Sequence, residues 1–186
     1  MKSKLCITTI FIIYCILFSG CDKSVAPDET ILKKGTFKAT VTGYYNYTIY
    51  GHAVFDNISN GPSRIFFLEL GDTTGPRNSN RYVEFKGTEP SVGTHNIYDY
   101  TSQNDSSKNI IEAGYSDSES YTYFNSTGGT IQTGIANNNE IKGRADFTAY
   151  GFINKGKGQS IKEEIKVTAE FYAEQGNTGI ILNKKY

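Results

Sequence analysis

Few side chains in this 186-residue sequence have the type and spacing that catalysis requires. A hydrolytic triad needs a nucleophile, a base that is commonly histidine, and an acid that orients the base. His52 and His95 are the only histidines; the first lies within an expected strand and the second opens another. The string nearest to a Gly-x-Ser-x-Gly nucleophile elbow, Gly114–Ser118, lacks the closing glycine. We therefore expect no catalytic residues, and we assign both histidines to pairing or surface roles.

Carboxylates are the other groups that could act, because two Asp or Glu side chains at a suitable separation can cleave glycosides. Acids on expected strands or strand ends are Glu69, Asp72, Glu84, Asp99 and Glu112. Solvated or ion-paired strand faces produce the same spacing, so a carboxylate-based hydrolase is the weakest of three functional hypotheses. We expect no metal and no cofactor, since two distant histidines do not make a zinc site and the acidic turns match no calcium-loop spacing.

Tyrosine is the one residue type whose enrichment suggests a binding role. Thirteen of the 14 tyrosines follow Cys21, and the candidates for ligand binding are Tyr44, Tyr45, Tyr47, Tyr50, Tyr98 and Tyr100. Aromatic faces beside Asn and Asp suit sugar rings and protein hot spots, because they join a large flat area to a polar tip. The alternative is that tyrosine favours half-exposed strand faces, and the absence of tryptophan weakens a sugar site.

The amino-terminal residues carry the most specific signal in the sequence. Lys2 and Lys4 precede a nearly unbroken apolar run over residues 5–18, which as a helix covers roughly 20 Å of the ~30 Å that a membrane span must cross. Ser19, Gly20 and Cys21 follow at once. This arrangement resembles the lipobox of bacterial lipoproteins, although Phe18 stands where that family usually has leucine. The alternative is an ordinary signal peptide that leaves Cys21 as an accidental thiol.

The lipoprotein resemblance implies how the chain is divided and where it resides. It makes residues 1–20 a signal peptide and residues 21–34 a lipidated tether on Cys21, and the length of the remainder, residues 35–186, predicts a single β-domain. Two or three acyl chains anchor a protein effectively irreversibly, since each buried methylene adds about 0.8 kcal/mol. We therefore expect a membrane anchor in the bacterial cell envelope, at the outer membrane, with the leaflet left open.

Composition limits the partners and the means of stabilisation. Cys6 and Cys15 leave with the signal peptide, so no disulfide is available and stability must come from packing. The 19 basic and 19 acidic residues balance, and loss of Lys2 and Lys4 makes the mature chain slightly acidic. A near-neutral chain without a basic stripe argues against nucleic acid and against anionic lipid headgroups as partners.

Short runs of alternating apolar and polar residues fill the rest of the sequence. In the first of them, Phe37, Ala39 and Val41 point one way and the threonines and lysine between them point the other. Similar runs recur about every ten residues and are joined by turns too short to hold helices, which indicates an antiparallel all-β fold. We predict a β-sandwich of about 8–10 strands, with an up-and-down, lipocalin-like β-barrel as the alternative.

Two segments of this strand pattern are ambiguous. Ser126–Gly129 predicts a turn between strands at residues 121–124 and 130–135. Residues 160–163 fit a helix capping box, and residues 161–175 combine near-helical apolar spacing with strict alternation. Alternation and the β-branched and aromatic content favour a strand there, and a helix would form a lid on the sheet.

The inward side chains give a second functional hypothesis, a carrier of a small apolar ligand. Inward alanines would leave room inside a closed barrel: Ala39, Ala53, Ala145, Ala149, Ala169 and Ala173. The opposing possibility is that phenylalanines such as Phe37, Phe147 and Phe171 fill that room, as packed cores normally require. A continuous cavity would favour the carrier, and interdigitated phenylalanines would remove it.

The segments after Cys21 also resemble a broad group of small Bacteroidota envelope lipoproteins. The likeness lies in residues 35–39, 90–94, 128–131 and 142–147, and consists largely of turn glycines and core aromatics. It supports the β-fold, and that group offers no established activity to carry over. Our leading hypothesis is a non-catalytic β-domain that binds an envelope protein or glycan, or serves as a scaffold.

Overall fold

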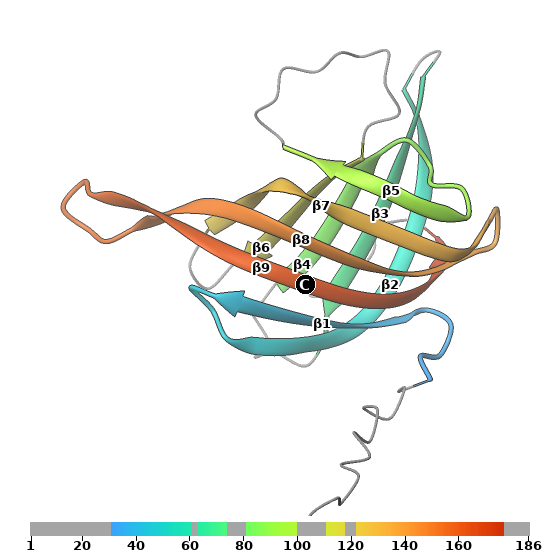
Figure 1. Ribbon diagram of the computed structural model, residues 1–186, viewed down its shortest axis with the longest axis horizontal. Helices are drawn as coiled ribbons and strands as arrows, with labels where there is room; N and C mark the ends of the chain where they lie inside the picture. The colour runs from blue at the N-terminus through green and yellow to red at the C-terminus, as the bar shows by residue number, and fades with distance from the viewer. Residues whose placement is uncertain (1–30, 61–62, 74–80, 100–110, 118–121, 177–186) are drawn as a thin grey trace, which may run out of the picture. The chain divides into compact units, whose positions relative to one another are not determined.

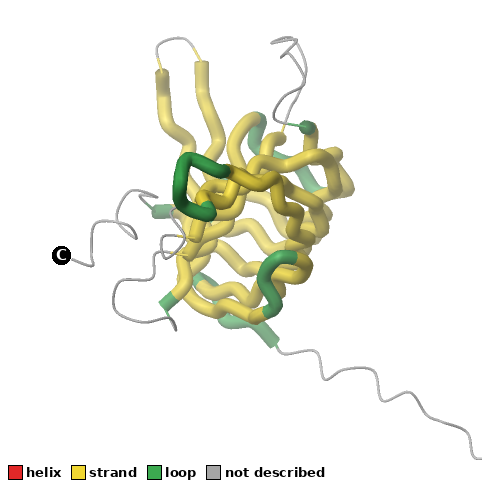
Figure 2. The backbone as a smooth tube through the Cα atoms, turned by 90° about the vertical axis from the view of Figure 1, so that its left-hand side faces the viewer, coloured by secondary structure: helices red, strands yellow, loops and turns green. Residues whose placement is uncertain are grey.

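A computed structural model describes residues 31–60, 63–73, 81–99, 111–117 and 122–176. Cys21, Tyr100, the expected signal peptide and most of the expected tether lie outside the described residues. The described residues form strands and loops (Figure 2), and they contain no helix long and apolar enough to cross a membrane. The strands are β1 (Thr36–Gly43), β2 (Tyr47–Asn60), β3 (Ser63–Asp72), β4 (Arg81–Gly87), β5 (Gly93–Tyr98), β6 (Ile111–Asp117), β7 (Thr122–Asn137), β8 (Glu140–Asn154) and β9 (Ser160–Gln175).

The strands form one sheet that closes on itself in the order β1-β2-β3-β4-β6-β5-β7-β8-β9 (Figure 1). Closure comes from β9, which pairs antiparallel with β1 along the whole length of β1. Almost all neighbours are antiparallel; β2–β9 and β5–β6 add short parallel pairings. The prediction of an antiparallel all-β fold of about 8–10 strands is therefore confirmed.

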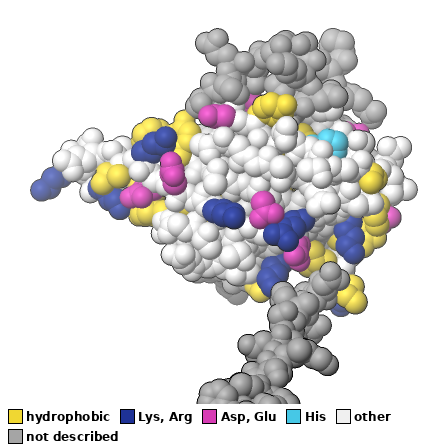
Figure 3. Space-filling view, in the orientation of Figure 1, with side chains coloured by type: hydrophobic (Ala, Val, Ile, Leu, Met, Phe, Trp, Pro, Cys, Tyr) yellow, Lys and Arg dark blue, Asp and Glu magenta, His cyan; other side chains and the backbone are white. Residues whose placement is uncertain are grey.

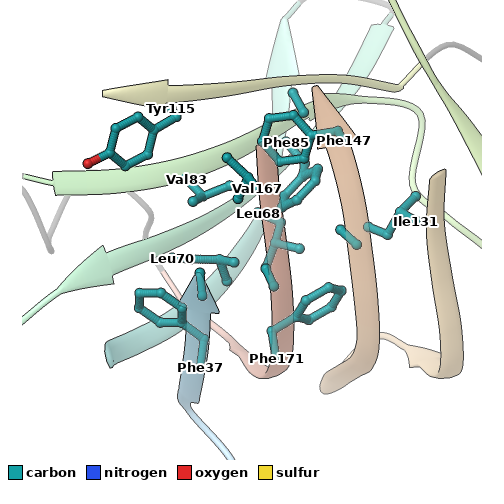
Figure 4. Packing of buried hydrophobic residues seen from close by; sticks show 14 of the residues in the cluster. Phe37, Leu68, Leu70, Val83, Phe85, Tyr115, Ile131, Phe147, Val167 and Phe171 are labelled. Carbon is teal, nitrogen blue, oxygen red and sulfur yellow. The ribbon is translucent and has the colours of Figure 1, made fainter. Parts of the chain in front are cut away.

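Phenylalanine rings from opposite walls meet inside the closed sheet. The ring of Phe85 on β4 lies 5.8 Å from that of Phe147 on β8 and 6.3 Å from that of Phe171 on β9 (Figure 4). All three side chains are at most 2% exposed. The sheet is thus closed as in the barrel alternative, and its two walls pack face to face as the layers of a sandwich do.

The inward alanines provide the space that these rings occupy. Ala39, Ala145 and Ala169 lie side by side in register on β1, β8 and β9, and each is at most 1% exposed. A row of small side chains on one wall leaves room for large side chains from the other wall. Phe85 fills part of that room from β4, and this packing weighs against the apolar carrier.

The segment that could have been a helix is strand β9. It pairs with β8 from Glu140 opposite Glu174 to Asn154 opposite Ser160. Its buried side chains alternate with more exposed ones, as the sequence pattern predicts: Ile165, Val167, Ala169, Phe171 and Ala173. Residues 165–172 of β9 pair with β1 on one side and with β8 on the other. This tertiary pairing outweighs the capping-box signal.

The predicted turn at Ser126–Gly129 is wrong, because residues 122–137 form the single strand β7. The register between β7 and β8 shifts between Ser126 and Gly128, which is the signature of a β-bulge. A Cβ on Gly129 would lie only 2.3 Å from the carbonyl oxygen of Asp146, so glycine here permits close approach of two strands. Residues of β7 before the bulge pair with β6, and residues after it pair with β5.

Candidate functional site

A groove with a volume of about 320 Å³ lies on the outer face of β4, β6 and β7. Its lining residues are Glu84, Lys86, Glu112, Ala113, Tyr123 and Asn125, and we call it the outer groove. Strand alternation explains most of the lining: Phe85 and Phe124 point into the core, so the residues on either side of them point outward, whereas Ala113 is itself a core residue. The volume lies at the small end of the range for ligand pockets, about 300–1,000 Å³.

Gly114 shapes the outer groove by leaving a gap in the middle strand. It lies on β6 directly between Glu84 on β4 and Asn125 on β7. The ring of Tyr123 occupies the space above it, and a Cβ at this position would lie 1.9 Å from the tyrosine hydroxyl oxygen. That hydroxyl donates a hydrogen bond of 2.5 Å to Oε1 of Glu84. Tyr123 therefore spans from β7 across β6 to β4.

The remaining groove side chains carry opposite charges. Lys86 on β4 stands directly opposite Glu112 on β6, on the same outward face. Opposite charges at such a cross-strand position attract each other modestly. The outer groove thus offers carboxylate acceptors, an ammonium donor, an amide and one fixed aromatic ring, which together suit a polar, hydroxyl-rich ligand.

Glu69 is a buried carboxyl next to the outer groove. It faces outward from β3, opposite Glu84, yet it is only 7% exposed. Its Oε1 has no hydrogen-bond partner in the described part of the chain. Burial, and to a lesser extent the negative charge of Glu84, together raise the pKa of Glu69 to about 7. Three of the predicted acids thus lie close together, since Glu84 and Glu112 line the groove and Glu69 adjoins Glu84.

The tyrosine candidates do not share one face. Tyr45 and Tyr47 pack against the core, and the Tyr45 ring lies 5.4 Å from the Tyr47 ring. Tyr44 and Tyr50 are exposed, with the amino groups of Lys155 and Lys38 lying 5.0 and 5.9 Å from the respective ring centres. Tyr98 is half-buried on β5, and Tyr100 lies outside the described residues. The described candidates therefore do not form a single aromatic platform.

Tyr47 belongs to a buried polar network that we call the end cluster, made of Tyr47, Arg81, Tyr115 and Asp117. The Tyr47 hydroxyl donates to Oδ2 of Asp117 at 3.1 Å and is also hydrogen-bonded to the Tyr115 hydroxyl, which is the donor in that bond. Nε of Arg81 lies 3.7 Å from the same carboxylate oxygen, and its guanidinium carbon lies 4.4 Å from the Tyr47 ring centre. Burial raises the pKa of both tyrosines, so both keep their protons.

The histidines and remaining acids lie away from the groove lining. Nε2 of His95 donates to the carbonyl oxygen of Ser91 at 2.7 Å, and His52 is exposed on β2. Asp72 ends β3 and Asp99 follows β5, so neither adjoins Glu84 in register. Within the described ranges, no three His, Cys, Asp or Glu side chains are placed to hold a metal ion.

Sequence reasoning missed Lys86 and Asn125 as possible binding residues, and it included Tyr123 only in the general enrichment of tyrosine. A partial signal existed in Gly114, a glycine inside a strand, which often marks a place where another group approaches closely. The group that approaches is Tyr123, and identifying it requires knowing that β7 lies beside β6.

The chain was compared with protein-family models, with curated proteins and with solved structures, and it matches none of them.

Proposed function

We propose that this chain is a lipoprotein of the bacterial cell envelope, anchored through Cys21, whose β-domain binds a glycan or protein without catalysing a reaction. The lipobox resemblance supports the anchor, and the outer groove supports the binding role. The observation that carries the binding role is the Tyr123 ring, held over Gly114 by its hydrogen bond to Glu84. A ring fixed before binding loses little freedom when a ligand arrives.

The groove lining favours a glycan over a protein. Hydroxyl groups of a sugar can donate to Glu84 and Glu112 and accept from Lys86 and Asn125, while the ring of Tyr123 offers a flat contact surface. A protein hot spot usually needs a larger desolvated apolar area than one tyrosine provides. A protein ligand is therefore the second outcome of the binding experiment.

Site-specific crosslinking in intact cells tests the binding role. A photo-crosslinking amino acid is placed at Lys86 in the groove, and in a matched control at Lys166, an exposed lysine on β9. We expect an adduct from position 86 alone, shifted by periodate or glycosidases if the ligand is a glycan. An adduct shifted only by protease would assign a protein ligand. No adduct, or the same adduct from both positions, would contradict binding at the groove.

The anchor is tested separately by growth with labelled palmitate. We expect label on the unmodified chain and none on Cys21→Ala, because the thiol is the acylation site that the lipobox resemblance implies. Label that persists in the variant, or never attaches, would refute the anchor. Neither outcome changes the crosslinking result, so the two halves of the proposal can fail independently.

Glycoside hydrolysis stays as a third candidate because of Glu69. A carboxyl with a pKa of about 7 beside a second carboxylate is the pairing that glycosidases use as acid and base. Glu69 is buried and does not line the groove, so a ligand there would meet Glu84 first. Hydrolysis of a panel of glycosides by the mature chain, lost in Glu84→Gln, would promote this candidate above simple binding.

A further inference from the structure

The β8–β9 hairpin extends beyond the strands that flank it. On the β8 side, the last registered pair with β7 joins Tyr150 to Asn125; on the β9 side, β1 reaches only Ile165. Beyond these limits β8 and β9 pair only with each other in register, up to Asn154 opposite Ser160. The hairpin projects from the closed sheet at the left of Figure 1. We call residues 152–162 the hairpin tip.

The hairpin tip exposes large apolar side chains on both of its faces. Phe152 is 60% exposed and Ile161 is 47% exposed. Phe152 stands opposite Lys162, whereas Ile161 stands opposite Ile153, one position along. Because successive residues of a strand point to opposite faces, Phe152 and Ile161 lie on different sides of the ribbon. A protein partner that covers one face would leave the other side chain in water.

Positive charge is concentrated at the same place. The hairpin tip contains Lys155, Lys157 and Lys162 and no acidic residue, and the first carboxylates along β9 are Glu163 and Glu164. Lysine and hydrophobic side chains stand next to one another along this projection in Figure 3. Net charge averaged over the chain conceals this cluster, which is why composition argued against anionic lipid headgroups as partners.

The backbone of the turn is hydrogen-bonded within itself. The amide of Lys155 donates to the carbonyl oxygen of Gln159 at 2.9 Å, and the amide of Gln159 donates to the carbonyl oxygen of Gly156 at 3.0 Å. The amide of Gly156 donates to Oδ1 of Asn154 at 2.8 Å. Satisfied amides can leave water at low cost, which entry into a lipid interface requires.

We infer that the hairpin tip inserts shallowly into the surface of an anionic lipid bilayer. Phe152 and Ile161 enter the interface, which can reach these two side chains at once, whereas Ile153, on the same face as Ile161, stays packed in the core. Lys155, Lys157 and Lys162 stay at the level of the headgroups, where their charges meet the lipid phosphates. This inference concerns the folded domain and does not depend on acylation of Cys21.

A tryptophan reporter tests the insertion directly, because the chain contains no tryptophan. The mature chain is prepared with Cys21→Ser, so that no acyl chain supplies membrane binding, and with Phe152→Trp. The matched control carries Tyr50→Trp, at a position that is 44% exposed on β2. Each chain is mixed with phosphatidylcholine vesicles with or without phosphatidylglycerol, using unlabelled or brominated acyl chains.

We expect a blue shift and bromine quenching only for the indole at position 152, and only with the anionic vesicles. Ile161→Ala should weaken partitioning of the reporter chain by several-fold, and the pair Lys155→Gln and Lys157→Gln should abolish the preference for phosphatidylglycerol. Thermal unfolding of each variant confirms that the domain remains folded.

Three results would overturn the inference. The first is an emission spectrum at position 152 that is the same in anionic vesicles and in buffer. The second is equal quenching at positions 152 and 50, which indicates non-specific adsorption. The third is a protein crosslinked to the hairpin tip in cells by a chain that does not bind vesicles, which would assign a protein partner instead.

Discussion

The end cluster and the Glu69–Glu84 pair are both polar and largely buried, but they differ in how their polar groups are satisfied. In the end cluster, Tyr47 and Arg81 surround the carboxylate of Asp117, which is 2% exposed. At the outer pair, Tyr123 satisfies one oxygen of Glu84, whereas Oε1 of Glu69 has no hydrogen-bond partner among the described residues. Both arrangements bury a carboxyl group, but only in the first does a hydroxyl donate to it and a guanidinium lie within ion-pairing distance.

This difference separates a structural network from a candidate site. A buried carboxylate with donors around it fixes the end of the barrel and is costly to disrupt. A buried carboxyl without them lowers the stability of the folded state once it ionises, and such perturbed groups concentrate at functional sites. The comparison therefore predicts that variants of Asp117 damage folding, and that variants of the outer pair change pH dependence or ligand binding.

The largest effect is expected from Asp117→Ala. Removing the carboxylate leaves the Arg81 guanidinium and the Tyr47 hydroxyl without their buried partner, so the free energy of unfolding should fall by about 3–5 kcal/mol. Urea unfolding followed by circular dichroism measures it. Asp117→Asn, which keeps an acceptor for Tyr47, should lose less. A loss below about 1 kcal/mol for Asp117→Ala would show that the end cluster is not structural.

The second effect is a pH dependence that Glu69→Gln should remove. The pKa of Glu69 is raised from 4.5 to about 7, so the folded chain binds this proton more tightly than the unfolded chain does. Its contribution to stability is therefore full below about pH 4.5 and is lost as the pH rises to about 7, a fall of about 2–3 kcal/mol.

Urea unfolding of the two chains at pH 5 and pH 8 isolates this contribution, since other titrating groups are common to both. We expect Glu69→Gln to be the more stable chain at pH 8, and the advantage to shrink at pH 5. A difference between the chains that stays constant with pH would show that the Glu69 carboxyl is not perturbed, and the contrast with the end cluster would disappear.

A smaller effect is expected from Gly114→Ala, which acts on Tyr123 rather than on a charge. The new methyl group would occupy the position of the tyrosine hydroxyl and displace the ring, breaking the hydrogen bond to Glu84. Because the ring end is partly exposed and can move, stability should fall by only about 1 kcal/mol. The crosslinked adduct from position 86 should be lost. Tyr123→Phe removes the same hydrogen bond without the clash and should retain part of the adduct.

Alternation predicted the strands because burial in this sheet follows a period of two along each strand. Phe37, Ala39 and Val41 are examples: the pattern places them on one face of their strand, and each is at most 1% exposed. The bulge in β7 could not be predicted in this way, because paired glycines serve both turns and bulges. Only the close approach of β8 to Gly129 distinguishes the two.

The outer groove was beyond sequence reasoning for a related reason. Its residues come from three strands, and β4 and β7 are separated by β6 in the sheet, although β5 comes between β4 and β6 in the chain. Alternation identifies Glu84 and Tyr123 as outward, but it does not say that one reaches the other across Gly114. The burial of Glu69 could not be predicted from the sequence either, since the alternation along its strand places Glu69 on the face that is expected to meet solvent.

The smallest effect on stability, and the clearest distinction between folding and binding, is expected from Glu112→Gln. Glu112 faces Lys86 across β4 and β6 at the mouth of the groove, and such exposed cross-strand pairs contribute below about 1 kcal/mol. Unfolding should therefore be almost unchanged, while the yield of the adduct from position 86 should fall because a charged acceptor is lost. Unchanged adduct yield would show that Glu112 does not contact the ligand, and the contrast would then rest on Glu69 alone.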